Sequence, residues 1–206
     1  MKVVPIGCRL LLMAAVLVLP AAVGCELAGG GGSPHTMTGA TGTAHAPGGL
    51  PPKSDTYKVI GRTKGIDGYV VKYSDRLYRG GCVTSEEGMK ALAARSIKTI
   101  VSITPDDAER RYAKQYGVTL VEAPFAKDKP VPDETLQRFL KAVRNASGPV
   151  YVHCHGGNHR GGTLAAAYRA HIEGWDWDKT LVEFGRLGGS LKDDDTMLES
   201  VRPANP

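Results

Sequence analysis

The chain has 206 residues, of which 42% are hydrophobic and 23% are charged. A typical domain takes about 100–200 residues, so this length and composition indicate one globular domain with an additional segment, and they exclude a chain that is disordered throughout. The formal net charge is +5, and loss of Lys2 and Arg9 with an N-terminal segment would lower it by two. This charge is too weak to indicate a nucleic-acid partner.

Residues 1–24 have the layout of a signal peptide. Lys2 and Arg9 precede an uncharged run that extends to residue 23 and is shorter than the roughly 20 apolar residues of a spanning helix. The sequence from Ala22 to Cys25 resembles the bacterial lipobox, which implies cleavage before Cys25 and diacylation of its thiol. The alternative is an ordinary secretory signal cleaved near the same residues. Both interpretations predict an exported protein.

Residues 25–55 are rich in Gly, Pro, Thr and Ser and have almost no apolar periodicity. They predict a flexible tether with an r.m.s. reach of about 30 Å. Acyl chains on Cys25 would hold the protein at a membrane, because each buried methylene contributes about 0.8 kcal/mol. By the same resemblance, Glu26 after the cysteine predicts a lipoprotein that is anchored at the outer membrane, facing the periplasm, in a bacterium with two membranes. In a bacterium with one membrane the protein is expected at the cell surface.

Residues 56–190 alternate β-like and helix-like segments, which predicts a three-layer α/β domain whose central, mostly parallel sheet is flanked by helices. The predicted strands are short β-branched runs of the kind that is buried on both faces: 97–103, 118–123 and 149–153. Residues 191–206, which include three consecutive aspartates, are expected to form a polar, solvated tail.

Apolar spacing and capping residues place helices between these strands. A capping box at 84–87 predicts a helix through Ala93, and 104–107 supplies an N-cap, a first-turn proline and acids for the next helix. Three further helices are predicted from apolar repeats: Leu136, Phe139, Leu140 and Val143; Leu164, Tyr168 and Ile172; and, in the final helix, Trp177, Leu181, Phe184 and Leu187.

Residues 150–163 place a strand, a glycine-containing loop and a helix in immediate succession. Inward-facing N–H groups of such a loop, with about half a positive charge at the helix N-terminus, predict a site for a dianionic phosphate. Cys154 opens the loop, where the same field favours a reactive thiolate. Arg160 presents a planar fork suited to two phosphoryl oxygens. The predicted substrate-binding residues are His155, Gly156, Gly157, Asn158, His159, Arg160 and Gly161.

His153, Cys154, Gly157 and Arg160 match the active-site pattern of the cysteine-dependent protein tyrosine phosphatase superfamily. The resemblance covers about residues 77–187 and points to the compact dual-specificity branch, near bacterial members and small plant and fungal phosphatases of inositol polyphosphates. It implies hydrolysis of a phosphoprotein or inositol phosphate through a phosphocysteine on Cys154, with no metal or organic cofactor. It also implies that His153 is buried and hydrogen-bonds the loop.

Such a phosphatase needs an acid to protonate the leaving oxygen. The sequence Val131-Pro132-Asp133 resembles an Ile-Pro-Asp stretch of the small plant and fungal relatives, which favours Asp133 over the second candidate, Asp128. An Asp at the start of a helix is also what an N-cap requires, so capping is the alternative role for Asp133. The alternative for Asp128 is a solvated loop charge.

Gly161 departs from the family pattern, in which a Ser or Thr follows the arginine and helps the thiolate to leave. The departure keeps open a second interpretation, a catalytically impaired module that binds phosphate. Thr163 is the nearest hydroxyl that would replace the missing one.

The remaining histidines and cysteines have alternatives of their own. His155 and His159 are expected at the outer rim of the loop. A zinc cluster of these two with His153 and Cys154 is the alternative, although consecutive strand residues point to opposite faces. Cys82 is expected to be a small buried residue, or a reversible disulfide partner of Cys154 in an oxidising compartment.

Overall fold

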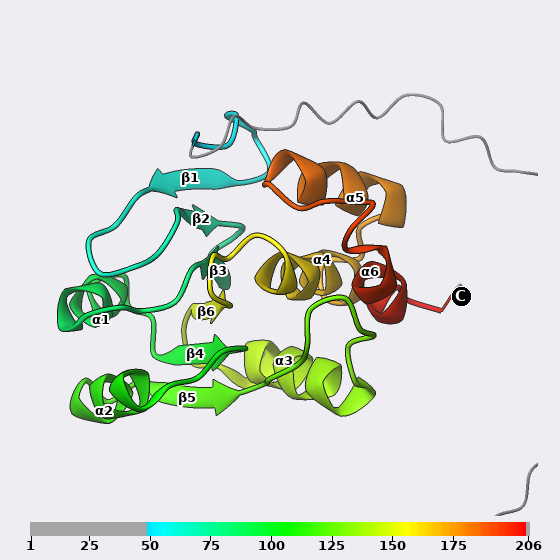
Figure 1. Cartoon of the computed structure of the whole chain (residues 1–206). Coiled ribbons are helices and arrows are strands. Elements are labelled where there is room, and N and C mark those ends of the chain that lie inside the picture. The colour runs from blue at the N-terminus through cyan, green and yellow to red at the C-terminus, as the bar shows by residue number, and fades with distance from the viewer. Residues whose placement is uncertain (1–48, 205–206) are drawn as a thin grey trace, which may run out of the picture. The chain divides into compact units, whose positions relative to one another are not determined.

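The computed structural model describes residues 49–204. The predicted signal peptide, Cys25 and most of the predicted tether lie outside these residues. The described chain forms a six-stranded sheet with helices on both faces, which confirms the predicted fold class (Figure 1). The elements in chain order are β1 (Lys58–Gly61), β2 (Val70–Lys72), β3 (Leu77–Gly80), α1 (Glu86–Ala93), β4 (Thr99–Ser102), α2 (Asp107–Gln115), β5 (Thr119–Glu122), α3 (Asp133–Asn145), β6 (Val150–His153), α4 (Arg160–His171), α5 (Trp177–Arg186) and α6 (Asp195–Val201).

The strand order is β1-β2-β3-β6-β4-β5, so β6 lies between β3 and β4. β1, β2 and β3 are antiparallel neighbours, whereas β3, β6, β4 and β5 run parallel. Gly80, His153 and Ser102 stand in register at the carboxyl ends of β3, β6 and β4. Ligands of open α/β sheets bind beyond this edge, which is where the loop that begins at Cys154 leaves the sheet.

The sheet separates two cores. α1 and α2 cover one face, and α3, α4, α5 and α6 lie on the other (Figure 1). Because successive side chains of a strand point to opposite faces, Tyr151 belongs to the core under α1 and α2, while Val150 and Val152 belong to the larger core. α4 is buried along nearly its whole length and packs against α3, α5 and α6. The helix that follows the candidate loop is therefore firmly held.

The three strands predicted from the sequence are present as β4, β5 and β6. β4 and β6 are buried, as expected, but β5 is only partly buried because it forms an edge of the sheet. The antiparallel strands β1 and β2 were not among the predictions. They are three or four residues long, too short for a clear alternating pattern.

The predicted apolar stripe of α3 is confirmed, since Leu136, Phe139, Leu140 and Val143 are all buried. At the N-termini of α1 and α2, the capping hydrogen bonds differ from those predicted. Ser85 occupies the N-cap of α1 without a capping bond, because its hydroxyl donates to Glu87 instead. The N-cap of α2 is Asp106, whose carboxylate accepts from the backbone N–H of Glu109 at 2.7 Å.

The expected solvated tail at 191–206 is wrong in part, because a helix forms within that segment and buries its apolar residues. Residues Asp195–Val201 form α6, which packs against α4. Met197, Leu198 and Val201 are at most 2% exposed and belong to the larger core. Their spacing puts all three on one helix face. The pattern is short and follows three aspartates, so the sequence suggested a solvated tail and not a helix. α5 is therefore not the final helix.

Within residues 49–204, no helix combines the length and the apolar character that crossing a bilayer requires.

Candidate functional site

The candidate site is the connection between β6 and α4. β6 ends at His153, α4 begins at Arg160, and Cys154 lies between them only 4% exposed. His155 and Gly156 are exposed, while Asn158 and His159 are half-buried. The loop thus presents one side to solvent and keeps the cysteine at its base, as a site for a small anionic group requires.

Glycine at position 157 allows the loop to lie directly on the end of β3. Gly157 has φ +86°, and a Cβ there would come within 2.5 Å of the Gly80 carbonyl oxygen. On the same side, the backbone N–H of Cys82 donates to the His155 carbonyl at 2.9 Å. The loop is therefore fixed by backbone contacts to the strand beside it.

Arg79 supports the loop from inside the domain. This side chain is 1% exposed, and its guanidinium donates to the carbonyls of Asn158 at 3.3 Å and Leu187 at 2.9 Å. Burial acts to lower the pKa of Arg79, but Tyr73, Tyr69 and Cys154 outweigh burial and raise the pKa. The buried Arg79 cation therefore lies close enough to Cys154 for their charges to interact. Sequence reasoning used Arg79 only as part of a resemblance and missed this role.

Arg160 is the first residue of α4 and donates from Nη1 to the Phe125 carbonyl at 3.3 Å. Phe125 belongs to the connection between β5 and α3, which also carries both candidate acids. This contact places the connection beside the loop and its arginine.

Both candidate acids are exposed. Asp128 has a left-handed backbone, φ +63°, and its carboxylate lies 4.0 Å from the Lys127 ammonium. Asp133 is the first residue of α3, after the N-cap Pro132, and no side chain caps this helix. The capping role considered for Asp133 is therefore not what the structure shows, and its carboxylate remains available for other chemistry.

His153 anchors the base of the loop, as its resemblance to the family implies. It is fully buried, its Nδ1 lies 3.3 Å from the Cys154 carbonyl, and its Nε2 lies 2.6 Å from a Glu109 carboxylate oxygen. The other Glu109 oxygen accepts from the Ser102 hydroxyl at 2.7 Å. Glu109 and Ser102, from α2 and β4, are a support that the sequence pattern did not reveal.

We expect Glu109→Ala to lower the free energy of unfolding by about 3–5 kcal/mol, because it leaves buried His153 and Ser102 without their acceptor. Urea unfolding followed by circular dichroism measures this change. Glu109→Gln is the matched control, since it keeps an oxygen for His153 and a polar group beside Ser102, and its loss should be smaller. An alanine variant as stable as the parent would contradict this structural role.

His159 reaches the C-terminal segment. Its Nδ1 lies 2.7 Å from Oδ2 of Asp194, which is fully buried and also accepts from the Ser190 backbone N–H at 2.9 Å. His159 itself keeps 40% of its side chain exposed. The aspartate expected in a solvated tail is thus a support of the loop.

The two described cysteines are not paired with each other. Cys82 and Cys154 are free thiols. Burial and a hydrogen bond to Asp67 raise the pKa of Cys82 to about 12, which makes it a poor nucleophile and does not favour exchange with Cys154. In the part of the chain that the structure describes, the zinc cluster considered for His153, Cys154, His155 and His159 does not form, because their ligand atoms do not converge.

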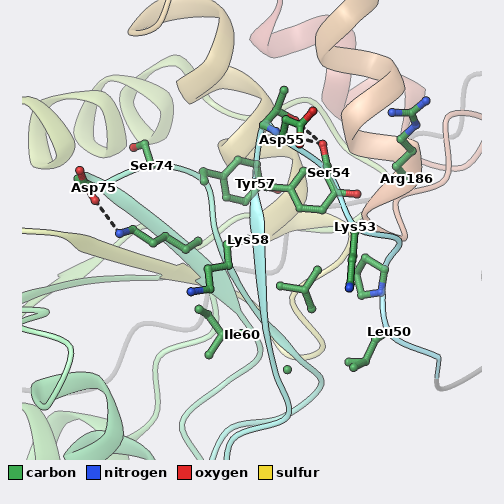
Figure 2. A pocket seen from close by; sticks show the side chains of 16 residues that line it. Leu50, Lys53, Ser54, Asp55, Tyr57, Lys58, Ile60, Ser74, Asp75 and Arg186 are labelled. Carbon is green, nitrogen blue, oxygen red and sulfur yellow. Dashed lines mark hydrogen bonds and ion pairs between the residues drawn. The ribbon is translucent and has the colours of Figure 1, made fainter.

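A pocket of about 1270 Å³ lies elsewhere, around β1 and the segment that precedes it (Figure 2). Its lining comes from residues 50, 51 and 53–61, residues 72–75 and Arg186. The Asp75 carboxylate, labelled in Figure 2, lies 2.6 Å from the Lys72 ammonium. The lining contains no cysteine or histidine and no residue of the loop, so the candidate active site is the loop.

Known proteins resemble this chain over the same region. Dual specificity protein phosphatase TpbA of Pseudomonas aeruginosa (strain UCBPP-PA14) is 34% identical over 131 residues, which are 63% of this chain and 58% of TpbA. The chain thus spans less than two thirds of the length of this curated relative. Inositol diphosphatase DSP4 of Arabidopsis thaliana is 26% identical over 110 residues, which are 48% of this chain and 54% of that protein.

Solved structures show the same similarity. The crystal structure of P. aeruginosa TpbA in complex with phosphotyrosine has 29% sequence identity and a TM-score of 0.59, and the match covers 75% of this chain and 93% of that one. The PTP-NADK family, described as DSP-PTPase phosphatase fused to NAD+ kinase, matches residues 56–192. Because this match takes in more than half of the sequence, the chain belongs to the DSP-PTPase phosphatase family.

Proposed function

We propose that this protein is a cysteine-based phosphatase that hydrolyses phosphate monoesters through a phosphocysteine intermediate. The observation that carries the proposal is the position of Cys154. It is buried at the junction of β6 and α4, ahead of Arg160 at the helix start, and it interacts electrostatically with the buried cation of Arg79. Loop N–H groups and the guanidinium of Arg160 favour an anionic ligand beside the cysteine.

The first step forms a bond from the Cys154 sulfur to phosphorus while the bond from phosphorus to the leaving oxygen breaks. Arg160 and the loop N–H groups stabilise the equatorial oxygens, and Asp133 gives a proton to the leaving oxygen. In the second step the Asp133 carboxylate takes a proton from water, water oxygen attacks phosphorus, and the thiolate leaves. Asp128 is the second candidate for this acid.

The proposed substrates are phosphoproteins or inositol phosphates, since relatives include TpbA, solved with phosphotyrosine, and an inositol diphosphatase. Release of inorganic phosphate from p-nitrophenyl phosphate by the full chain tests the activity. Binding of phosphate without release would instead favour the phosphate-binding module that Gly161 suggests. We propose no nucleic-acid partner.

Gly161→Ser is expected to speed hydrolysis of the phosphocysteine. A Cβ at position 161 would lie 3.5 Å from the Cys154 nitrogen and 3.7 Å from its sulfur, which are ordinary contact distances, so a serine fits and brings a donor near the leaving thiolate. Thr163 does not fill this role, because its hydroxyl donates to the His159 carbonyl at 3.1 Å. Rapid-quench measurement of phosphocysteine decay gives the rate. Gly161→Ala is the control, and equal decay in both variants would contradict the expectation.

We also propose that the protein is exported and held at a membrane by acyl chains on Cys25. The support is the sequence pattern of residues 1–55, with its charged start, apolar run, small residues before Cys25 and Gly/Pro-rich tether. Metabolic labelling with palmitate, compared between the parent and Cys25→Ala, tests the anchor. Export without any label would favour the ordinary secretory signal.

A further inference from the structure

A cluster of side chains of the types that bind metals lies next to the phosphate-binding loop. Asp67, Cys82 and His155 each offer one ligand atom, and these atoms all lie within 4.8 Å of one another. The three residues come from different places: the connection between β1 and β2, the segment after β3, and the second position of the loop. None of the three has a part in the proposed hydrolysis step beyond the place of His155 in the loop.

Backbone hydrogen bonds hold the three ligand-bearing segments together. The Asp67 N–H donates to the Cys82 carbonyl at 3.0 Å, and the Cys82 N–H donates to the His155 carbonyl at 2.9 Å. Gly81 allows close approach, since a Cβ there would lie 2.4 Å from the Asp67 carbonyl oxygen. The cluster is thus built into the scaffold and does not depend on the chance meeting of flexible side chains.

The distances fit a tetrahedral metal centre. The Cys82 sulfur lies 3.3 Å from Oδ2 of Asp67 and 3.8 Å from Nδ1 of His155. Zinc bound at about 2.3 Å to sulfur and about 2.0–2.2 Å to nitrogen or oxygen separates such ligands by about 3.6 Å at tetrahedral angles. These two separations lie on either side of this value, and the Asp67 and His155 ligand atoms lie within 4.8 Å of each other. Small side-chain movements would therefore bring the three ligands to one ion.

The charges of the cluster also suit a divalent cation. The Cys82 thiol donates a hydrogen bond to the Asp67 carboxylate. A divalent metal that replaced the thiol proton would have its two positive charges neutralised by one thiolate and one carboxylate. A mixture of sulfur, imidazole nitrogen and carboxylate oxygen is the ligand set of zinc, whereas magnesium and calcium prefer oxygen alone. Because His155 is exposed, water can reach the fourth coordination position of a tetrahedral metal bound there.

We propose that Asp67, Cys82 and His155 form a zinc-binding site beside the phosphate-binding loop. The site stands on its own geometry and does not rest on the proposed function. Its occupancy fixes the His155 ring at the rim of the loop and replaces a local charge of −1 by a neutral centre. The metal is not a participant in the hydrolysis, which needs only the cysteine, the arginine and an acid.

Cobalt titration of the full chain tests the site, because a thiolate bound to Co²⁺ gives a charge-transfer absorption band. The titration uses Cys154→Ser, so that the loop cysteine cannot bind the metal, and compares it with the double variant Cys154→Ser/Cys82→Ser. The expected result is a band that saturates at one Co²⁺ per chain in the first protein, disappears on addition of Zn²⁺, and is absent from the second. A band of equal strength in both proteins would overturn the proposal.

Two further variants keep the test decisive if Cys82→Ser does not fold. Asp67→Asn and His155→Gln, each in the Cys154→Ser background, remove one ligand each, and His155 is exposed, so its replacement costs little stability. Each should weaken Co²⁺ binding by about tenfold or more, since even outer-shell changes at metal sites cost 10–100-fold. Unchanged affinity in both variants, or binding only when Cys154 is present, would overturn the proposal without affecting the proposed phosphatase activity.

Discussion

Cys154→Ser is expected to abolish phosphate release while the protein still binds phosphate and vanadate. A serine hydroxyl is not ionised at neutral pH and cannot replace the thiolate as nucleophile. The anion-binding groups remain, because Arg160 and the loop N–H groups do not depend on the sulfur. Steady-state turnover of p-nitrophenyl phosphate and isothermal titration with vanadate measure the two properties separately.

Arg160→Ala and Arg160→Lys are the matched controls for this experiment. Removing the guanidinium should weaken both turnover and vanadate binding, and lysine should restore charge without the two-pronged geometry that suits phosphoryl oxygens. A Cys154→Ser protein with parental turnover would contradict the cysteine mechanism. A Cys154→Ser protein that has lost anion binding together with turnover would contradict the role given to the loop.

Asp133→Asn is expected to lower turnover of alkyl phosphates by about 10²–10⁴-fold, with a much smaller effect on aryl phosphates. An alkoxide is a poor leaving group that needs the proton, whereas a nitrophenolate does not. A merely structural carboxylate would not distinguish the two substrates, so the ratio of their rates is the informative measurement.

Asp128→Asn is the companion variant for the acid. Both aspartates lie on the exposed connection between β5 and α3 or at the start of α3, so both changes should leave the fold intact. If the dependence on leaving group steepens only in Asp128→Asn, the acid lies five residues upstream of Asp133. If the dependence of turnover on the leaving group is the same in both variants as in the parent, neither aspartate is the proton donor.

The sequence predicted the fold class and the position of the loop between β6 and α4 because both depend on local patterns. The runs that became β4 and β6 are continuous and β-branched, and the residues from His153 to Arg160 are adjacent in the chain. The edge position of β5 and the short antiparallel strands were not predictable in this way, since they depend on pairing between distant segments.

The supports of the loop were missed for the same reason. Glu109, Arg79 and Asp194 lie 44, 79 and 35 residues away from the groups they hold. In the sequence each looks like an ordinary surface charge. Asp194 shows the difficulty most clearly, because two neighbouring aspartates made a buried carboxylate look like part of a solvated run.

The attachment of His159 to Asp194 makes the end of the described chain part of the active site. Residues 190–201 supply no nucleophile and no acid, yet they hold the loop through a buried carboxylate and close the larger core with Met197, Leu198 and Val201. Cleavage by a protease before this segment would therefore remove a support of the loop without touching the cysteine. During synthesis, likewise, the loop gains the support of the Asp194 carboxylate only after this residue has left the ribosome.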